Sequence, residues 1–323
     1  MILVTGSAGF IGQAVCAALL ARGEHVVGLD NFNDYYEPRL KRDRVARLAS
    51  EAHFAQVEAE LADRAALDAL FARLRPRRIV HLAAQAGVRH SFDHPEAYVR
   101  SNLVGFVNLL EAARHDGSIE HLVYASSSSV YGGNLKQPFS VDDAVDQPIS
   151  LYAATKRANE LMARVYALQF GLRLTGLRYF TVYGPWGRPD MAPVKFARAL
   201  LADRPIEVYG HGDMRRDFTY IDDAVAGTLA ALDDTRHFGA VPHRLYNLGN
   251  SHPEPLMRFI QELARAAGRS PVLQMRPMQP GDVRSTSADI EATTRDLNWR
   301  PTTPIEAGLP PMLEWCRSYY GGG

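Results

Sequence analysis

Three evenly spaced glycines, Gly6, Gly9 and Gly12, constrain the fold of this chain more than any other feature of its sequence. They follow an apolar run at residues 2–5 that predicts a β-strand, and they open a helical pattern over residues 10–22. A glycine-rich turn between a strand and a helix allows close backbone approach, and the helix N-terminus attracts a pyrophosphate. The spacing differs from the G-x-G-x-x-G form, so its weight comes from this context. The segment predicts a dinucleotide-binding turn.

Short apolar runs alternate with longer amphipathic stretches through the first half of the chain. Near-continuous apolar strands that alternate with helices predict a parallel sheet covered on both faces. We therefore expect an α/β fold, a Rossmann-type doubly wound parallel sheet with a smaller, irregular α/β substrate lobe. The strand candidates are residues 2–5, 25–29, 53–57, 78–82, 121–125, 172–178 and 245–248, and the helical patterns cover 10–22, 63–74, 95–115 and 151–170.

The character of the sequence changes after Phe180. Residues 181–220 are rich in Gly, Pro, Arg and aromatic side chains, and residues 251–323 combine prolines with short helical runs. Ligands of open α/β sheets bind outside the carboxyl ends of the strands, where an irregular lobe would close over a substrate. We expect residues 1–178 plus 219–250 to form the dinucleotide-binding domain, and residues 179–218 plus 251–323 to form the substrate lobe.

Charge and cysteine content limit the partners of this chain. Lys+Arg and Asp+Glu number 36 each, so no global basic field draws the chain to nucleic acid or to an anionic membrane. No apolar segment predicts a signal peptide or a transmembrane helix. The two cysteines, Cys16 and Cys316, stand at opposite ends, which fits a reducing cytoplasm. We expect a cytoplasmic protein with no metal site, no nucleic-acid partner and no membrane partner.

Asp30 identifies the cofactor more closely. It ends the second strand candidate, 18 residues after Gly12. A carboxylate there can accept hydrogen bonds from the adenosine ribose and repels a 2′-phosphate, and no arginine follows immediately, so NAD is favoured over NADP. The simpler interpretation is a glycine-rich turn with a surface aspartate, but strand, glycines, helix and acid occur in the required order. Leu82, Ala83 and Ala84 follow another strand candidate. Taken alone, this segment indicates packing at a strand end, and its small side chains could also contact the cofactor.

Tyr152 and Lys156 predict the chemistry. Positions i and i+4 project from one face of a helix, and a nearby cation lowers a tyrosine pKa from about 10 towards the value that a general base near neutrality needs. Ser127, 25 residues earlier in a run of four serines, can bond both the phenol and a substrate oxygen. An isolated pair would more simply be a surface aromatic and a solvated lysine. After a dinucleotide motif, it predicts proton removal from an alcohol beside a nicotinamide.

The glycine turn, the serine run before Val130-Tyr131-Gly132, and the tyrosine–lysine pair resemble the extended short-chain dehydrogenase/reductase superfamily over nearly the whole chain. The resemblance implies that Tyr152 is the acid/base, that Lys156 holds the ribose and lowers the tyrosine pKa, and that Ser127 binds the substrate. Glu60 stands where aspartate is more usual. The implied NAD contacts are Gly6, Gly9, Phe10, Ile11, Gly12, Asp30, Asn31, Asn33, Glu60, Leu61, Leu82, Ala83, Ala84, Tyr152 and Lys156.

Three segments, residues 30–36, 81–89 and 178–191, extend the resemblance to nucleotide-sugar enzymes, the UDP-glucuronate 4-epimerase family in particular. Thr181 stands where UDP-galactose 4-epimerases carry asparagine. Arg188 matches the arginine that holds the sugar carboxylate, and a guanidinium offers a bidentate fork to that group. Pro193 departs from the usual pattern. The implied substrate contacts are Arg89, Ser127, Ser128, Ser129, Thr181, Arg188, Arg216 and Asp282.

The resemblance implies interconversion of UDP-glucuronate and UDP-galacturonate at C4, through a transient 4-keto intermediate and with tightly bound NAD. Nucleotide-sugar 4,6-dehydratases carry Asp-Glu where this chain has Ser128 and Ser129, and UDP-glucuronate decarboxylases typically carry glutamate at the position of Ser129. The alternatives are such a decarboxylase, another UDP-sugar 4-epimerase and, more distantly, a non-catalytic dinucleotide-sensing protein. Related enzymes often dimerise through the helix that carries Tyr152, so we expect a homodimer.

Overall fold

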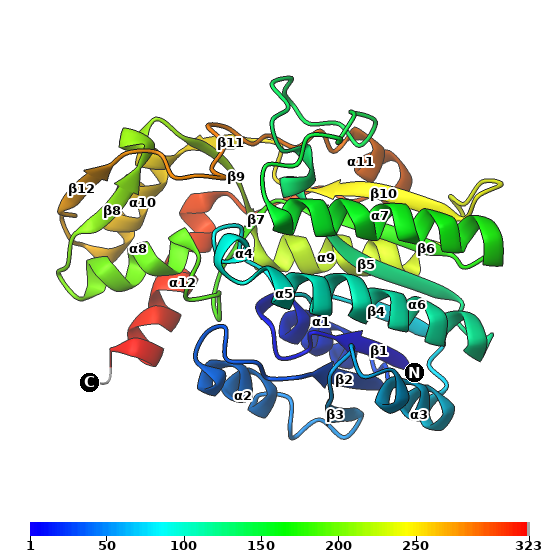
Figure 1. Cartoon of the computed structure of the whole chain (residues 1–323). Helices are drawn as coiled ribbons and strands as arrows, with labels where there is room; N and C mark the ends of the chain where they lie inside the picture. The colour runs from blue at the N-terminus through cyan, green and yellow to red at the C-terminus, as the bar shows by residue number, and fades with distance from the viewer. Residues whose placement is uncertain (322–323) are drawn as a thin grey trace.

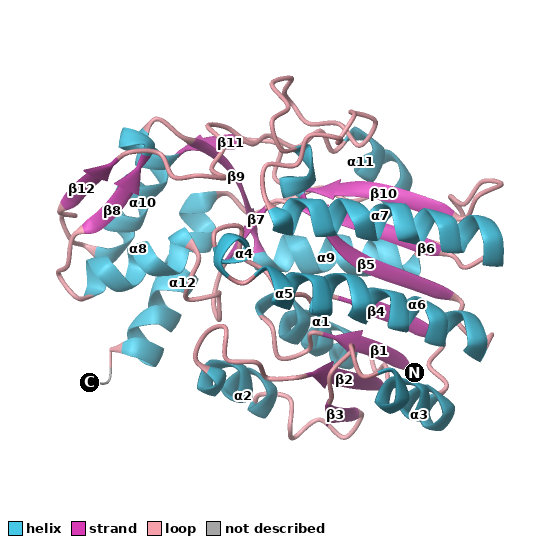
Figure 2. Cartoon of the chain, in the orientation of Figure 1, coloured by secondary structure: helices cyan, strands magenta, loops and turns pink. Residues whose placement is uncertain are grey.

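A seven-stranded parallel sheet forms the centre of the protein, with helices on both of its faces (Figures 1 and 2). This computed structural model describes residues 1–321. The strand order is β10-β6-β5-β4-β1-β2-β3, so the winding reverses between β1 and β4. This architecture confirms the predicted doubly wound sheet. The strands are β1 (Ile2–Thr5), β2 (Val26–Asp30), β3 (Phe54–Glu58), β4 (Arg78–His81), β5 (His121–Ser127), β6 (Leu174–Tyr179) and β10 (His243–Leu248).

Alternate side chains of the central strand enter two separate cores, as the strand period of two requires. Ile2 and Val4 pack in a cluster with residues of α1 and α9, whereas Leu3 packs on the opposite face with residues of α3, α6 and α7. Figure 1 shows the latter three helices in front of the sheet. The covering helices are α1 (Phe10–Ala21), α2 (Pro38–Ala46), α3 (Arg64–Leu74), α6 (Gly105–Asp116), α7 (Leu151–Phe170) and α9 (Ile221–Asp233).

The helix predicted over residues 95–115 is wrong in detail, because it is interrupted. Two short helices, α4 (His90–Asp93) and α5 (Pro95–Tyr98), precede the π-helical turn η1 (Val99–Val104), and α6 begins only at Gly105. Within η1, the Asn102 carbonyl accepts a hydrogen bond from Asn159 Nδ2 at 2.7 Å, and its side-chain amide donates to the Thr155 hydroxyl at 3.0 Å. These bonds to α7 favour a distortion that the hydrophobic pattern does not encode.

The rest of the chain adds two small sheets and four helices, of which α11 packs against β10 and α9 beside the large sheet (Figure 1). The strand order β11-β9-β7 forms one sheet, and β12 pairs with β8 in the other. Strand β9 crosses the predicted boundary at residue 218, and the division into two non-contiguous domains stays a prediction. Pro193 lies in the first turn of α8, where its missing N–H is tolerated. The elements are β7 (Thr181–Tyr183), α8 (Ala192–Leu201), β8 (Ile206–Tyr209), β9 (Arg215–Tyr220), β11 (Pro253–Pro255), α10 (Leu256–Ala267), β12 (Leu273–Arg276), α11 (Glu291–Leu297) and α12 (Ile305–Tyr320).

Two short 3-10 turns complete the secondary structure, η2 (Ser128–Tyr131) after β5 and η3 (Gly210–Gly212) after β8. None of the helices within residues 1–321 combines the length and the apolar character needed to cross a lipid bilayer.

Candidate active site

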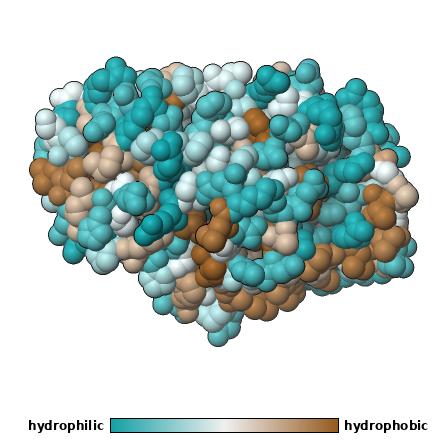
Figure 3. Space-filling model, turned by 90° about the horizontal axis from the view of Figure 1, so that it is seen from above, coloured by the Kyte–Doolittle hydropathy of each residue, from teal (hydrophilic) through white to brown (hydrophobic). Residues whose placement is uncertain are grey.

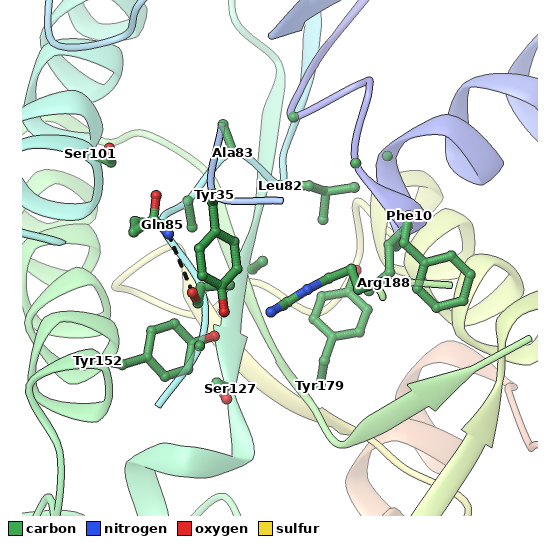
Figure 4. A pocket seen from close by; sticks show the side chains of 18 of the residues that line it. Phe10, Tyr35, Leu82, Ala83, Gln85, Ser101, Ser127, Tyr152, Tyr179 and Arg188 are labelled. Atoms are coloured by element: carbon green, nitrogen blue, oxygen red, sulfur yellow. Dashed lines mark hydrogen bonds between the residues drawn. The ribbon is translucent and has the colours of Figure 1, made fainter. Parts of the chain in front are cut away.

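A cavity of about 340 Å³ opens at the carboxyl ends of the central strands. Its lining runs from the glycine turn, past the serines at the end of β5, to the first turn of α7 and the segment after β7 (Figure 4). It lies at the point where the strand order reverses, which is where open α/β sheets bind their ligands. Segments far apart in the sequence therefore meet in one site.

The glycine turn brings the backbone too close for side chains. Gly6 has a φ of +73°, and a Cβ added there would lie 2.6 Å from the Ala83 nitrogen. A Cβ on Gly12 would lie 2.0 Å from the Gly6 oxygen. Helix α1 begins after Gly9 with no side-chain cap and no acidic residue in its first turn. Its first N–H groups therefore offer an anion site of the kind that holds a pyrophosphate.

Asp30 is buried at the end of β2. Its carboxylate accepts hydrogen bonds from the backbone N–H groups of Ala8 at 3.1 Å and Phe32 at 2.9 Å. Burial raises the pKa of this carboxyl, and the Phe32 bond and the Lys41 charge oppose the rise. Two lone pairs stay available for ribose hydroxyls. The turn and this carboxylate together fit a dinucleotide without a 2′-phosphate.

The predicted cofactor residues are brought together. Glu60, the departure from the usual aspartate, accepts a hydrogen bond from Asn31 Nδ2 at 2.9 Å and so joins the same wall. All of the predicted cofactor residues line the cavity: Gly6, Gly9, Phe10, Ile11, Gly12, Asp30, Asn31, Asn33, Glu60, Leu61, Leu82, Ala83, Ala84, Tyr152 and Lys156. Their individual contacts with NAD stay predictions.

Lys41 also lines the cavity and was missed in the sequence. Its ammonium donates to the Asn33 carbonyl at 2.7 Å and to Asn33 Oδ1 at 2.6 Å. Burial lowers the pKa of this lysine, and the Asp30 charge opposes the fall. The available signal was a lysine in the first turn of a helix soon after the acidic strand end, but no helix was predicted at α2.

The first two turns of α7 place the tyrosine and the lysine. Ser150 caps the helix by accepting a hydrogen bond from the Ala153 N–H at 3.1 Å. Lys156 is 2 % exposed and donates to the Ala125 carbonyl at 2.8 Å. In Figure 4 the Tyr152 hydroxyl points towards Ser127 at the end of β5. The predicted trio therefore shares one end of the cavity.

The pKa of Tyr152 shifts in the opposite direction from the sequence-based expectation. Burial raises the pKa of Tyr152, while the hydrogen bond with Ser127 and then the charge of Arg188 lower it. The Lys156 ammonium donates to the Ala125 carbonyl, and the charge that lowers the pKa of Tyr152 is that of Arg188. Burial lowers the pKa of Lys156 to about 8, against the charge of Glu160, so the ammonium form prevails at pH 7.

A buried ion pair beneath the trio fixes β5, β6 and α7 to one another. Glu160 accepts hydrogen bonds from Arg178 at 2.8 and 2.9 Å and from the Ser126 hydroxyl at 2.6 Å, and both charged side chains are 1 % exposed. Ser126 precedes Ser127, and Glu160 lies one turn after Lys156. The sequence analysis missed this pair, although a glutamate four residues after the lysine was a usable signal.

The residues predicted to bind the sugar carboxylate lie beside the trio in the same cavity. Thr181 begins β7, and Arg188 follows it in the segment before α8; both line the cavity with Ser128 and Ser129. In Figure 4 the Arg188 guanidinium extends past Tyr179 towards Tyr35 and Tyr152. A cation and a candidate base therefore face the same space, as a substrate with both an acid and an alcohol would require.

Three predicted substrate contacts lie apart from the cavity lining. Arg89 forms an ion pair with Asp282 at 3.0 Å and stacks 4.9 Å from the centre of the Tyr209 ring. Arg216 donates to the backbone carbonyls of Arg215 at 2.9 Å and Arg284 at 3.2 Å. Their roles in binding the nucleotide stay predictions. Within residues 1–321, no group of His, Cys, Asp and Glu side chains is arranged to hold a metal ion.

Comparisons with known proteins agree on one family. Residues 2–249 match the model described as the NAD dependent epimerase/dehydratase family. The chain is 47% identical to UDP-glucuronate 4-epimerase 3 of Arabidopsis thaliana over 336 residues, covering 100% of this chain and 77% of that protein. It is 43% identical to Protein CapI of Staphylococcus aureus over 99% of both chains. Among solved structures, UDP-glucuronic acid 4-epimerase from Bacillus cereus, in complex with UDP-glucuronic acid and NAD, superposes with a TM-score of 0.93 at 34% identity over 99% of both chains.

Proposed function

The chain belongs to the NAD dependent epimerase/dehydratase family, and from that premise we propose that it interconverts UDP-glucuronate and UDP-galacturonate by C4 epimerisation. The observation that carries this proposal is the shared cavity of Tyr152, the glycine turn and Arg188. One cavity thereby offers a proton acceptor, a dinucleotide cradle and a cation for an acidic sugar.

We assign the proton steps to Tyr152. Its phenolate removes the C4 hydroxyl proton as the C4–H bond breaks, and Ser127 holds the same oxygen by a hydrogen bond. NAD, when bound, supplies the hydride acceptor for this bond and returns the hydride, so no net redox occurs. The buried Lys156 ammonium lies where it can hold the cofactor ribose and keep the phenolate beside a positive charge.

The sugar then turns within the cavity and presents the other face of C4. Tyr152 returns its proton to the C4 oxygen, and the product carries the opposite configuration. We assign the diphosphate contact to Arg216, a further nucleotide contact to Asp282 and a second anion contact to Arg89, and these contacts hold the nucleotide while the ring moves. The same tyrosine therefore acts first as the base and then as the acid.

The intermediate of this reaction is prone to a side reaction. A carboxylate on C5 beside a C4 ketone makes a β-keto acid. Such an acid loses CO₂ when the C5–C6 bond is parallel to the π orbital of the carbonyl. We assign the restraint of this carboxylate to Arg188 and Thr181, which line the same end of the cavity. A guanidinium is suited to this task because it binds carboxylates in a fixed geometry.

The residues after β5 argue against the neighbouring reactions. Ser128 and Ser129 line the cavity where water elimination would need an acid and a base. The hydroxyl of Ser129 also stands in place of the glutamate that decarboxylases typically carry. A protein that only senses dinucleotides has no need of Tyr152 and Lys156 in this arrangement. Epimerisation is the reaction that these side chains support best.

Incubation with UDP-glucuronate, without added NAD, tests the proposal. We expect a mixture of UDP-glucuronate and UDP-galacturonate, because the hydride never leaves the site and a tightly bound cofactor is regenerated in each cycle. Chromatography of the nucleotide sugars separates the two acids from neutral products. UDP-xylose or a UDP-linked 4-keto-pentose as the main product would replace epimerisation with decarboxylation.

The helix that carries Tyr152 also presents an apolar outer face, for which we propose a second copy of the chain. Leu161, Val165 and Leu168 are 50, 53 and 56% exposed on α7 at spacings that share one face, and Val99 and Val104 are each 43% exposed on η1 beside it. Figure 3 shows hydrophobic residues gathered along the lower edge of that view, on the side of α6 and α7. Sedimentation should give twice the chain mass of 35.8 kDa.

We also infer a cytoplasmic location. Cys16 and Cys316 are both free and buried, each packed within the apolar core. Thiols of this kind act as small core residues and do not need an oxidising compartment.

A further inference from the structure

Asp190 contacts the arginine that we assign to the sugar carboxylate. Arg188 Nε donates to Asp190 Oδ1 at 3.1 Å, and Arg188 Nη2 donates to Asp190 Oδ2 at 2.5 Å. The two side chains are only 22% and 25% exposed, so solvent screens the pair incompletely. Asp190 itself is absent from the cavity lining. It therefore approaches the guanidinium from behind.

This bidentate contact divides the guanidinium into two edges. A guanidinium has five N–H donors, and the Nε–Nη2 edge is occupied by Asp190. The Tyr35 hydroxyl also lies beside the guanidinium, but its own hydrogen is donated to Asp190 Oδ2. The edge formed by Nη1 and the second hydrogen of Nη2 stays available to a planar acceptor in the cavity, and a carboxylate fits such an edge with two parallel bonds.

Tyr35, which lines the cavity, also contacts Asp190. Its hydroxyl donates to Asp190 Oδ2 at 2.9 Å, and its ring centre lies 5.7 Å from the Arg188 guanidinium. Gly87, with a φ of +106°, leaves the space that this hydroxyl needs, since an added Cβ would lie 2.3 Å from it. Tyr35 follows β2, whereas Asp190 precedes α8. The chain of contacts therefore joins the two lobes.

The backbone around Arg188 is held independently. The buried Arg44 of α2 donates to the carbonyl of Trp186 at 2.6 and 3.0 Å and to that of Gly187 at 3.2 Å. The main chain beside Arg188 is thus fixed by one arginine, and the Arg188 side chain is fixed by Asp190. Loss of the Asp190 contact should release the side chain while leaving its backbone in place.

We propose that Asp190 is the positioning residue that orients Arg188 and leaves its second donor edge to the C5 carboxylate of the sugar, with Tyr35 as the anchor of Asp190. The inference rests on the proposed function and identifies how that site restrains its intermediate. Two carboxylates then flank one guanidinium. The repulsion between the two carboxylates weakens binding of the acidic sugar, and the oriented guanidinium fixes the angle of the sugar carboxylate.

The orientation matters because of the 4-keto intermediate. If the carboxylate rotates to a position where the C5–C6 bond is parallel to the π orbital of the C4 carbonyl, that bond breaks, its electron pair passes to C5 and the C4 carbonyl as an enolate, and CO₂ leaves. C5 then takes a proton, and a UDP-linked 4-keto-pentose remains. A guanidinium held at two points resists this rotation, whereas a mobile one follows the carboxylate.

Asp190→Asn tests the proposal, because it keeps the side-chain shape but replaces one acceptor oxygen by a donor. We expect the share of 4-keto-pentose and UDP-pentose among the products to rise at least about tenfold, because the two-point contact between Arg188 and Asp190 is lost. We also expect UDP-glucuronate to bind about three- to tenfold more tightly while affinity for UDP-glucose is unchanged, because the second negative charge is gone. Product chromatography and calorimetry measure the two effects.

Three matched variants complete the experiment. Asp190→Glu retains a carboxylate and should return the product share towards that of the wild type, and Tyr35→Phe should cause a smaller rise than Asp190→Asn. Asp203→Asn removes an exposed carboxylate that pairs with Arg269 at 2.8 Å, far from this cavity, and should change neither measurement.

The product share decides the outcome. An unchanged pentose share in Asp190→Asn would overturn the proposal, whatever the change in turnover. The proposed function fails separately, if the wild-type chain forms no UDP-galacturonate. In that case the two affinities still test the contact, and an equal change for UDP-glucuronate and UDP-glucose would overturn the role of Asp190 as well.

Discussion

Tyr152→Phe should lower the turnover of UDP-glucuronate by on the order of 10²–10⁴-fold while the protein keeps its bound NAD. The substitution removes only the hydroxyl that exchanges the C4 proton. The glycine turn, Asp30 and Lys156, which form the cofactor wall, stay intact. Product chromatography gives the turnover, and the nucleotide released on denaturation gives the cofactor content.

Tyr179→Phe is the matched control for that experiment. Tyr179 lines the same cavity, but its hydroxyl bonds to the Thr228 hydroxyl at 2.7 Å and not to the reacting space. Its loss should cost about one neutral hydrogen bond and leave turnover within about tenfold of the wild type. If Tyr152→Phe retained most of the activity, or if both variants lost it equally, Tyr152 would not be the base.

Glu160→Gln should lower the free energy of unfolding by about 3–5 kcal/mol, the usual cost of leaving one member of a buried ion pair without its partner. Glu160 and Arg178 are each 1 % exposed, and the amide can replace only one of the two acceptor oxygens that now bind the guanidinium. Urea unfolding followed by circular dichroism measures the change.

Two further variants separate burial from charge. Asp68→Asn breaks the exposed pair with Arg64 on α3 and should cost only about 0.3–0.5 kcal/mol. Glu160→Met combined with Arg178→Met should recover much of the stability lost in Glu160→Gln, because no isolated charge then stays buried. Equal losses in Glu160→Gln and Asp68→Asn would contradict the structural role of the buried pair.

The large sheet was predictable because its signals are local. A glycine turn after an apolar strand, an acid at the next strand end and the i, i+4 spacing of Tyr152 and Lys156 each lie within a few residues. The helix over residues 95–115 was wrong in detail for the opposite reason. Its π-helical turn depends on hydrogen bonds between Asn102 and α7, which lies more than 50 residues further along the chain.

The site residues that the sequence analysis missed also depend on partners that are distant in the sequence. Tyr35 lies within a segment that suggested the family, but its partner Asp190 is 155 residues away. Glu160 and Arg178 meet only when α7 packs on β6. The direction of the Tyr152 pKa was not predicted either, because the spacing to Lys156 does not show that the phenol is buried. Sequence spacing identifies which groups share a face, whereas their partners depend on the tertiary fold.

Conversion of UDP-glucuronate carrying deuterium at C4, without added NAD, tests the central claim most directly. If the hydride leaves C4 and returns to the same carbon within one closed site, the UDP-galacturonate formed should retain its deuterium at C4, as mass spectrometry and proton NMR would show. Loss of the label to solvent would contradict epimerisation through a transient 4-keto intermediate. Consumption of one NAD for each UDP-glucuronate converted would contradict it as well.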